Sequence, residues 1–143
     1  MISEFKNEHR FLSNFWPCEI NYEGINYSSV EHAYQAAKTD DIIIKKQIAN
    51  LSTPGKAKRF GNNIIQIKEF PNTKITIMNK LVNMKFSNDI KLLQMLLDTK
   101  DEFIVEGNTW HDNFWGSCYC DRCGNQGRNV LGKILMLVRD NLK

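Results

Sequence analysis

The stretch from Ser28 to Lys38 constrains the fold most, because it predicts a short helix with an apolar stripe and a polar stripe. Its apolar residues recur at helical spacing and need a core to face: Val30, Ala33, Tyr34 and Ala37. Its polar residues follow at i, i+4 and i+7: Glu31, Gln35 and Lys38. Seven residues at 3.6 per turn bring the first and the last of these almost into line, roughly 10 Å apart along the axis. One rigid element would therefore present a carboxylate, an amide and an ammonium group.

A structural role for Glu31 competes with a chemical one. Ser28 and Glu31 fit the capping box S-x-x-E, in which the glutamate side chain reaches back to a backbone N–H at the helix start. Spacing alone leaves capping and catalysis open.

Start and turn signals divide the remaining chain into short elements. Glu23-Gly24 joins two short strands, 18–22 and 25–27, into a hairpin. Asp41 and Pro54 mark helices at 42–51 and 54–60, with Gly61 as the stop. A longer helix is expected from residue 71 or 72 to about residue 86, with a buried stripe of Ile75, Met78, Leu81, Val82 and Met84 to Phe86. Ser87-Asn88-Asp89 caps another helix, and residues 129–142 form the last one. Residues 1–17 and 106–126 read as irregular.

The bulk properties predict one globular domain over residues 1–143. The chain has 143 residues, 42% apolar and 24% charged, which is ordinary for a soluble protein. It contains no run of about 18 apolar residues and no apolar signal segment, so we expect no membrane association and a cytoplasmic location. The net charge of +3 permits an anionic ligand without arguing for nucleic acid. The sequence says nothing about the oligomeric state.

Basic residues concentrate between Asn50 and Lys91, where eight lysines and arginines stand against only Glu69 and Asp89. Within this segment, Lys56, Lys58 and Arg59 follow a predicted helix start, which suits a phosphate group. The alternative is a solvated helical surface.

Two aromatic segments offer stacking surfaces. Asn14, Phe15 and Trp16 precede the hairpin, and form either a wall for a base or sugar or a hydrophobic plug. The segment 106–116 adds Trp110, His111, Asp112 and Trp115 within a long loop. Hydrolysis of a glycosidic bond usually needs two carboxyl groups, so Asp112 and Glu31 are a candidate pair. A turn residue that binds its own backbone is the alternative for Asp112.

Three cysteines, Cys118, Cys120 and Cys123, crowd into one short segment. They form part of a zinc-binding pattern, which lacks a fourth ligand. His111, Cys18, Asp121 or water would have to supply it. Free thiols in a turn-rich loop are the alternative.

The chain resembles the NADAR superfamily, the YbiA-like N-glycosidases, over nearly its whole length. The matching motifs include Phe11-Leu12-Ser13-Asn14-Phe15, Ser29-Val30-Glu31-His32, Gln35-Ala36-Ala37-Lys38, Ala57-Lys58 with Gly61, Met78, Lys85-Phe86, Glu106, Asp112, Trp115-Gly116 and a C-terminal G-x-N-x-L-G-x2-L-M-x2-R from Gly127 to Arg139. The chain departs from the family pattern at Asn62, where an arginine is common, at Phe70, where a tryptophan is frequent, and in the cysteine segment.

The resemblance implies a compact, mainly helical α+β fold and hydrolysis of an N-glycosidic bond between ribose and a nitrogenous base, with no cofactor. The implied substrates are phosphoribosylamino-pyrimidine intermediates of riboflavin synthesis or ADP-ribosylated guanine in nucleic acid. Glu31 and Asp112 would be the acidic groups, and Lys38 would hold a ribose oxygen or phosphate. The remaining candidate binding residues are Asn14, Phe15, Trp16, Gln35, Lys56, Lys58, Arg59 and Trp115. Arg139 is expected to tie the last helix to a carboxylate.

Two other functional classes remain open. A non-catalytic module would bind ADP-ribose in the same pocket without releasing a base. A zinc-stabilised interaction module would instead be built on the segment from Cys118 to Cys123.

Overall fold

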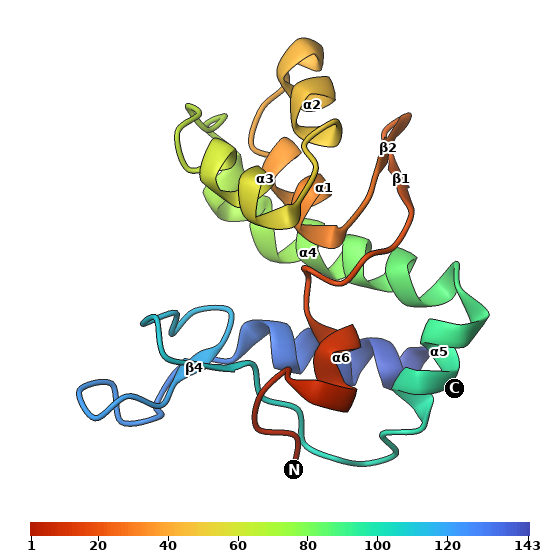
Figure 1. Cartoon of the computed structure of the whole chain (residues 1–143), viewed down its shortest axis with the longest axis vertical. Helices are drawn as coiled ribbons and strands as arrows, with labels where there is room; N and C mark the ends of the chain where they lie inside the picture. The colour runs from red at the N-terminus through yellow and green to blue at the C-terminus, as the bar shows by residue number, and fades with distance from the viewer. The chain divides into compact units, whose positions relative to one another are not determined.

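The computed structural model describes all residues from 1 to 143, which form two compact units (Figure 1). The central unit comprises residues 14–85. The terminal unit combines residues 1–13 with residues 86–143. The first residues of the chain therefore pack with its C-terminal half.

The central unit begins with the predicted hairpin. Strands β1 (Ile20–Tyr22) and β2 (Ile25–Tyr27) pair antiparallel, and Ile20 lies opposite Tyr27. Glu23 and Gly24 both have positive φ angles, 52° and 85°, as a tight two-residue hairpin turn requires. Ile20 and Tyr27 are buried and anchor the hairpin to the core of this unit.

Four helices follow: α1 (Val30–Ala36), α2 (Ile42–Ala49), α3 (Pro54–Gly61) and α4 (Phe70–Ser87), whose last residues belong to the terminal unit. The sequence sets their starts. Asp41 and Thr53 accept hydrogen bonds from backbone N–H groups in the first turns of α2 and α3, and Pro54 opens α3 as predicted. Helix α1 packs against α2, α3 and the hairpin, and its residues from Val30 to Ala36 are buried.

The buried face of α4 differs from the predicted stripe at two positions. Met78, Leu81, Val82 and Phe86 are buried, but Met84 is half-buried and Ile75 is 42% exposed. The helix begins at Phe70 instead of residue 71 or 72, and the centre of the Phe70 ring lies 5.4 Å from that of the Tyr34 ring. Phe70 fills the buried position at this end of α4, which leaves Ile75 on the solvent side.

The terminal unit contains α5 (Ile90–Leu97), α6 (Val130–Asn141) and the two-residue parallel strands β3 (Gly107–Asn108) and β4 (Ser117–Cys118). Asp89 caps α5, as predicted. Two expectations of irregular structure are wrong. Residues Asn7–Leu12 form the 3-10 helix η1, and the loop from 106 to 126 contains β3 and β4.

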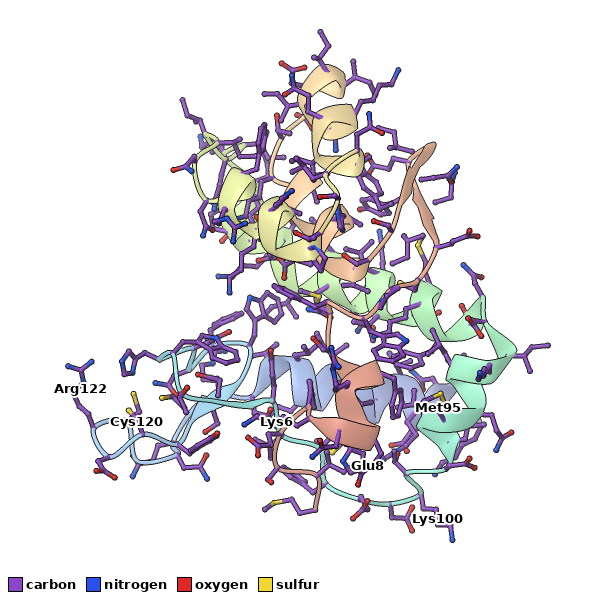
Figure 2. The ribbon with its side chains drawn as sticks, viewed as in Figure 1. Lys6, Glu8, Met95, Lys100, Cys120 and Arg122 are labelled. Carbon is purple, nitrogen blue, oxygen red and sulfur yellow. The ribbon has the colours of Figure 1, made fainter.

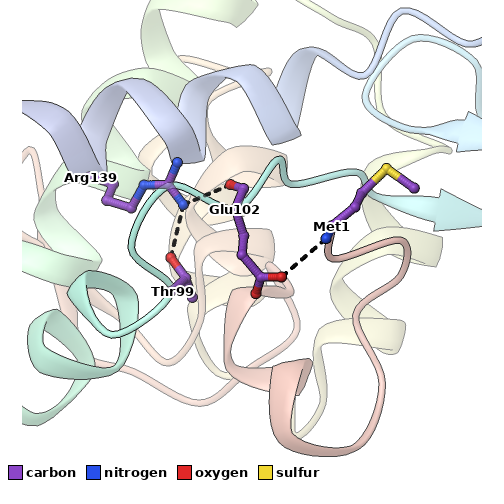
Figure 3. Close-up of polar contacts among 4 residues, drawn as sticks. All are labelled: Met1, Thr99, Glu102 and Arg139. Atoms are coloured by element: carbon purple, nitrogen blue, oxygen red, sulfur yellow. Dashed lines mark hydrogen bonds and ion pairs between the residues drawn. The ribbon is translucent and has the colours of Figure 1, made fainter.

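Arg139 of α6 has a structural role, with a partner other than the expected carboxylate (Figure 3). Its buried guanidinium donates from Nη1 to the Thr99 hydroxyl and to the backbone carbonyl of Glu102, each at 2.9 Å. The Glu102 carboxylate instead contacts the amino group of Met1 at 3.1 Å. Arg139 therefore secures the segment after α5 through neutral oxygen acceptors.

The predicted fold class, α+β and mainly helical with a small hairpin, is confirmed. The assignment of residues 1–143 to a single domain stays a prediction. None of the helices combines the length and the apolar character that a membrane-spanning segment requires.

Candidate functional site

The start of α1 is fixed by Ser29, so the predicted capping box at Ser28 is wrong. The Ser29 Oγ accepts the backbone N–H of His32 at 3.1 Å and lies 2.6 Å from its Nδ1. The Nε2 of the buried His32 ring donates to the carbonyl of Leu51 at 3.0 Å. Position N3 is thus His32, and Glu31 is the second residue of the helix. The side chain that caps the helix is thus that of Ser29.

Glu31 and Gln35 form a buried pair one turn apart. The Gln35 Nε2 donates to Glu31 Oε2 at 2.6 Å, and the two residues are 8% and 3% exposed. The first turn of a helix favours an ionised carboxylate, because the helix dipole places positive charge there. Gln35 in turn packs against Gly61 of α3. Any side chain at position 61 would overlap the Gln35 amide. Glu31 is therefore oriented by a neighbour that is itself held in place.

Lys38 lies just beyond the end of α1 and is buried. Burial is the main cause that lowers the pKa of its amine. The negative charge of Glu31 raises this pKa, whereas the positive charges of Lys58 and Lys74 lower it further. Its Nζ lies 5.9 Å from the centre of the Tyr34 ring, within the range of a cation–π contact. The structure thus brings the predicted residues Glu31, Gln35 and Lys38 together.

The three predicted phosphate ligands on α3 are exposed, and they differ in surroundings. The charge of Lys58 acts on Lys38, whereas the Nζ of Lys56 donates to the Ser52 hydroxyl at 2.9 Å. Arg59 belongs to the last turn of α3, and its guanidinium extends toward Gly55 in the first turn. Lys74 of α4 is a cation beside Lys38 that was not among the predicted site residues. It belongs to the basic segment 50–91, but no local signal separates it from the other lysines there.

The aromatic segment before the hairpin is tied to α1 through the backbone. The carbonyl of Asn14 accepts the N–H of Glu31 at 3.1 Å, and the Asn14 Nδ2 lies 3.5 Å from the sulfur of Met78. Phe15 is 41% exposed and Trp16 is half-buried. The interpretations of this segment as a stacking wall and as a hydrophobic plug both stay predictions.

Asp112 belongs to the terminal unit, where its carboxylate organises a turn. Its Oδ1 accepts the backbone N–H groups of Phe114 at 3.1 Å and Trp115 at 3.0 Å. The Trp115 ring meets that of Phe114 edge to face, with centres 4.8 Å apart. One carboxylate oxygen of Asp112 therefore binds the backbone of its own turn, as the structural alternative for this residue predicted. Its pairing with Glu31 stays a prediction.

Lys85 is a buried ionisable residue that was not among the predicted site residues. It lies on α4 and is 2% exposed. Burial lowers the pKa of its amine to about 7, although the electrostatic interaction with Cys18 raises it. The signal was in the sequence: Met78, Leu81 and Lys85 share one helical face, so a lysine stands within a buried stripe. A buried amine with this pKa is able to change charge near neutral pH.

The clustered cysteines come together with His111. The ligand atoms of His111, Cys118, Cys120 and Cys123 all lie within 4.8 Å of one another. Backbone N–H donation from Cys123 and a hydrogen bond with Cys118 lower the pKa of the Cys120 thiol to about 6. Of the fourth ligands considered for zinc, His111 is the one that joins this group, while Cys18 lies in the central unit.

Comparison with known proteins identifies a family. The model of the NADAR domain matches residues 2–143. An N-glycosidase of Nostoc punctiforme is 36% identical over 139 residues, covering 92% of this chain and 85% of the relative. The N-glycosidase YbiA of Escherichia coli is 32% identical over 133 residues, covering 92% of this chain and 80% of the relative.

A longer relative and a solved structure agree with this result. A riboflavin biosynthesis protein of Vibrio vulnificus is 34% identical over 137 residues; the match covers 94% of this chain but only 36% of that protein. The NMR structure of Escherichia coli YbiA matches with a TM-score of 0.82 and 28% identity, covering 99% of this chain and 86% of YbiA. The predicted resemblance is thus confirmed, and the names of the relatives support the predicted enzyme class. The chain belongs to the NADAR domain family.

Proposed function

We propose that the protein is an N-glycosidase that hydrolyses the bond between C1′ of a ribose and a nitrogenous base. The observation that carries the proposal is the buried carboxylate of Glu31, oriented by Gln35 and accompanied by the buried amine of Lys38. A positioned carboxylate is the group that glycosidic hydrolysis needs. Relatives that align over most of their length are named N-glycosidases.

In this mechanism water attacks C1′ and the C1′–N bond breaks, so its electron pair leaves with the base. Glu31 orients or deprotonates the water, or stabilises the positive charge that develops on the ribose. The leaving base needs a proton, and Asp112 is the candidate for the second acidic group. This assignment rests on the sequence motif, and the Asp112 variant described below tests it.

The basic surroundings of Lys38 favour an anionic substrate. Lys58 and Lys74 both disfavour the charged form of Lys38, so a bound phosphate would relieve repulsion among the three cations. We assign Lys38 to a ribose oxygen or phosphate and Lys58 to a phosphate. Phe15 and Trp16 are the candidates for stacking on the base.

A direct experiment distinguishes the two substrate classes. A phosphoribosylamino-pyrimidine and an oligonucleotide carrying ADP-ribosylated guanine are each incubated with the protein, and mass spectrometry detects released base and sugar. We expect release from the phosphoribosylamino-pyrimidine, because the Vibrio relative is named as a riboflavin biosynthesis protein. Release of base from the oligonucleotide alone would show that the substrate is ADP-ribosylated nucleic acid. Binding without release from either would support the non-catalytic module.

A covalent variant of the mechanism uses Lys38. Its amine would form an imine with C1′ of the opened ribose as the base leaves, and water would then hydrolyse the imine. This variant needs a neutral amine, and burial lowers the pKa of Lys38 in that direction. Borohydride added during turnover would trap an adduct on Lys38 if the imine forms. An active protein without such an adduct would support direct attack by water.

A further inference from the structure

We propose that His111, Cys118, Cys120 and Cys123 form a structural zinc site in the terminal unit. All four come from one segment of 13 residues, and their ligand atoms lie within 4.8 Å of one another. Figure 2 shows Cys120 on the loop that follows β4, with Arg122 beside it. The proposed glycosidase chemistry does not use this group.

The distances from the His111 nitrogen to the three sulfurs match those around one tetrahedral metal ion. The His111 Nδ1 lies 3.4 Å from the sulfur of Cys123 and 3.6 Å from those of Cys118 and Cys120. Zinc bonds of about 2.3 Å to sulfur and about 2.0 Å to nitrogen, at tetrahedral angles, place nitrogen and sulfur about 3.5 Å apart. One N–H on Nδ1 can point at only one sulfur, whereas a central cation contacts all three sulfurs and the nitrogen.

Two asparagines hold the ligand-bearing loops in place. The Oδ1 of the buried Asn108 accepts the N–H groups of Trp110 and Asp112, the two neighbours of His111. The Oδ1 of Asn113 accepts the N–H of Cys118 at 2.9 Å. The site is thus supported by side chains that position its ligands.

The turn from Cys120 to Gly124 adds a second feature suited to a metal. The N–H of Cys123 points at the sulfur of Cys120 at 3.4 Å, which stabilises negative charge on that sulfur. The N–H of Gly124 donates to the carbonyl of Cys120 at 2.9 Å, and Gly124 has a φ of +68°, which glycine adopts without strain. This closes the C-x2-C spacing common in zinc sites.

The ligand chemistry selects the metal and its role. Three thiolates and one imidazole favour zinc over magnesium or calcium, which prefer oxygen. All four positions are filled by the protein, so no open position remains for a substrate, and the site is structural. Coordination through Nδ1 leaves a proton on Nε2 of His111. Since Nη2 of Arg122, 3.3 Å from Nε2, is also a donor, zinc binding requires Arg122 to turn away.

A metal analysis of the purified full chain tests the proposal, with Cys18→Ser as the matched control because Cys18 lies in the other unit. The protein is stripped with a chelator under reducing conditions, reloaded with zinc and desalted. We expect one zinc per chain in the wild type, Cys18→Ser and Arg122→Ala. Cys120→Ser, Cys123→Ser and His111→Ala should each lose tightly bound zinc. Cobalt(II) should give the thiolate charge-transfer bands and strong d–d bands of a tetrahedral site.

Failure of the wild type to retain zinc, or equal retention in the wild type and Cys120→Ser, would overturn the proposal. Loss of metal in Cys18→Ser would also contradict it. If the ligand variants do not fold, the cobalt spectrum of the wild type decides: octahedral bands without thiolate charge transfer rule out the site.

Discussion

The Nε2 of Gln35 donates to the Oε2 of Glu31 at 2.6 Å, between two buried side chains on α1. This contact fixes the direction of the carboxylate to which we assign the chemistry. Because Gln35 rests on Gly61, the geometry of Glu31 depends on a glycine of another helix. The proposed function can therefore be tested without touching the carboxylate.

Gly61→Ala should impair both stability and turnover. The added methyl group would overlap the Gln35 amide and force it to move. Overpacking of this kind costs about 1–3 kcal/mol, and a misplaced catalytic group lowers turnover by roughly tenfold to a hundredfold. Urea denaturation and kcat for base release measure the two effects.

Gly55→Ala is the control for that variant, on the same helix. Its added methyl group would meet only the Arg59 guanidinium at 3.7 Å and the Thr53 hydroxyl at 3.9 Å, which is ordinary contact. We expect turnover and the free energy of unfolding to stay near wild-type values. Equal losses in the two variants would show that Gly61 has no special relation to Gln35.

Lys58→Ala should weaken binding of a phosphate-bearing substrate. The lost charge–phosphate attraction corresponds to a KM about tenfold higher, since about 1.4 kcal/mol is a factor of ten in affinity. The dependence of KM on salt should also decrease, because one screened ionic contact is gone. Lys68→Ala, another exposed lysine of the basic segment, is the control. A KM unchanged in Lys58→Ala would remove Lys58 from the site.

Asp112→Asn separates the two roles considered for this residue. An asparagine keeps an oxygen that can accept the N–H groups of Phe114 and Trp115, so the turn should survive. It cannot carry a carboxylate charge or donate an acidic proton. We expect normal thermal unfolding and a kcat about a hundredfold lower. Normal turnover in this variant would show that Asp112 stabilises the turn and has no catalytic role.

Lys85 should make stability rise with pH between about 7 and 9. Burial lowers the pKa of its amine from 10.5 to about 7, so the unfolded chain binds more protons than the folded protein across this range. The free energy of unfolding then increases with pH, by at most about 1.4 kcal/mol per pH unit for this one group. Urea denaturation at pH 7, 8 and 9 measures the slope.

Lys85→Met should flatten that pH dependence, since methionine does not titrate. Lys80→Met changes an exposed lysine of the same helix and should keep the wild-type slope. Identical slopes in Lys85→Met and the wild type would show that Lys85 does not titrate in this range.

Much of the fold could be predicted from local chemistry. Asp41, Pro54 and Asp89 mark helix starts because a short side chain that accepts backbone N–H groups, or a ring with fixed φ, acts within one turn. The hairpin was predictable for the same reason, from Glu23-Gly24 between two alternating runs. Ser28 and Ser29 were harder to separate, since adjacent serines carry the same capping chemistry.

Features set by distant packing could not be predicted. Ile75 fits the helical pattern but is exposed, because the inner position at that end of α4 belongs to Phe70. Lys74 looks like any other lysine of its segment until α4 brings it near Lys38.

The candidate site also contains residues that could be predicted from local spacing and residues that could not. Glu31 and Gln35 lie on α1 and Lys38 follows two residues after its end, so helical spacing predicted that the three come together. His111 was one of several possible zinc ligands, because the fold of two loops decides which side chain reaches the cysteines.

The rate of base release by Glu31→Gln tests the central claim most directly. The substitution keeps the shape of the side chain and removes its charge, and Glu69→Gln, an exposed glutamate of the same unit, is the control. With the substrate identified above and saturating protein, we expect Glu31→Gln to fold normally and to release base at least about a hundredfold more slowly than the wild type and Glu69→Gln. A folded Glu31→Gln protein with the wild-type rate would contradict a catalytic role for Glu31.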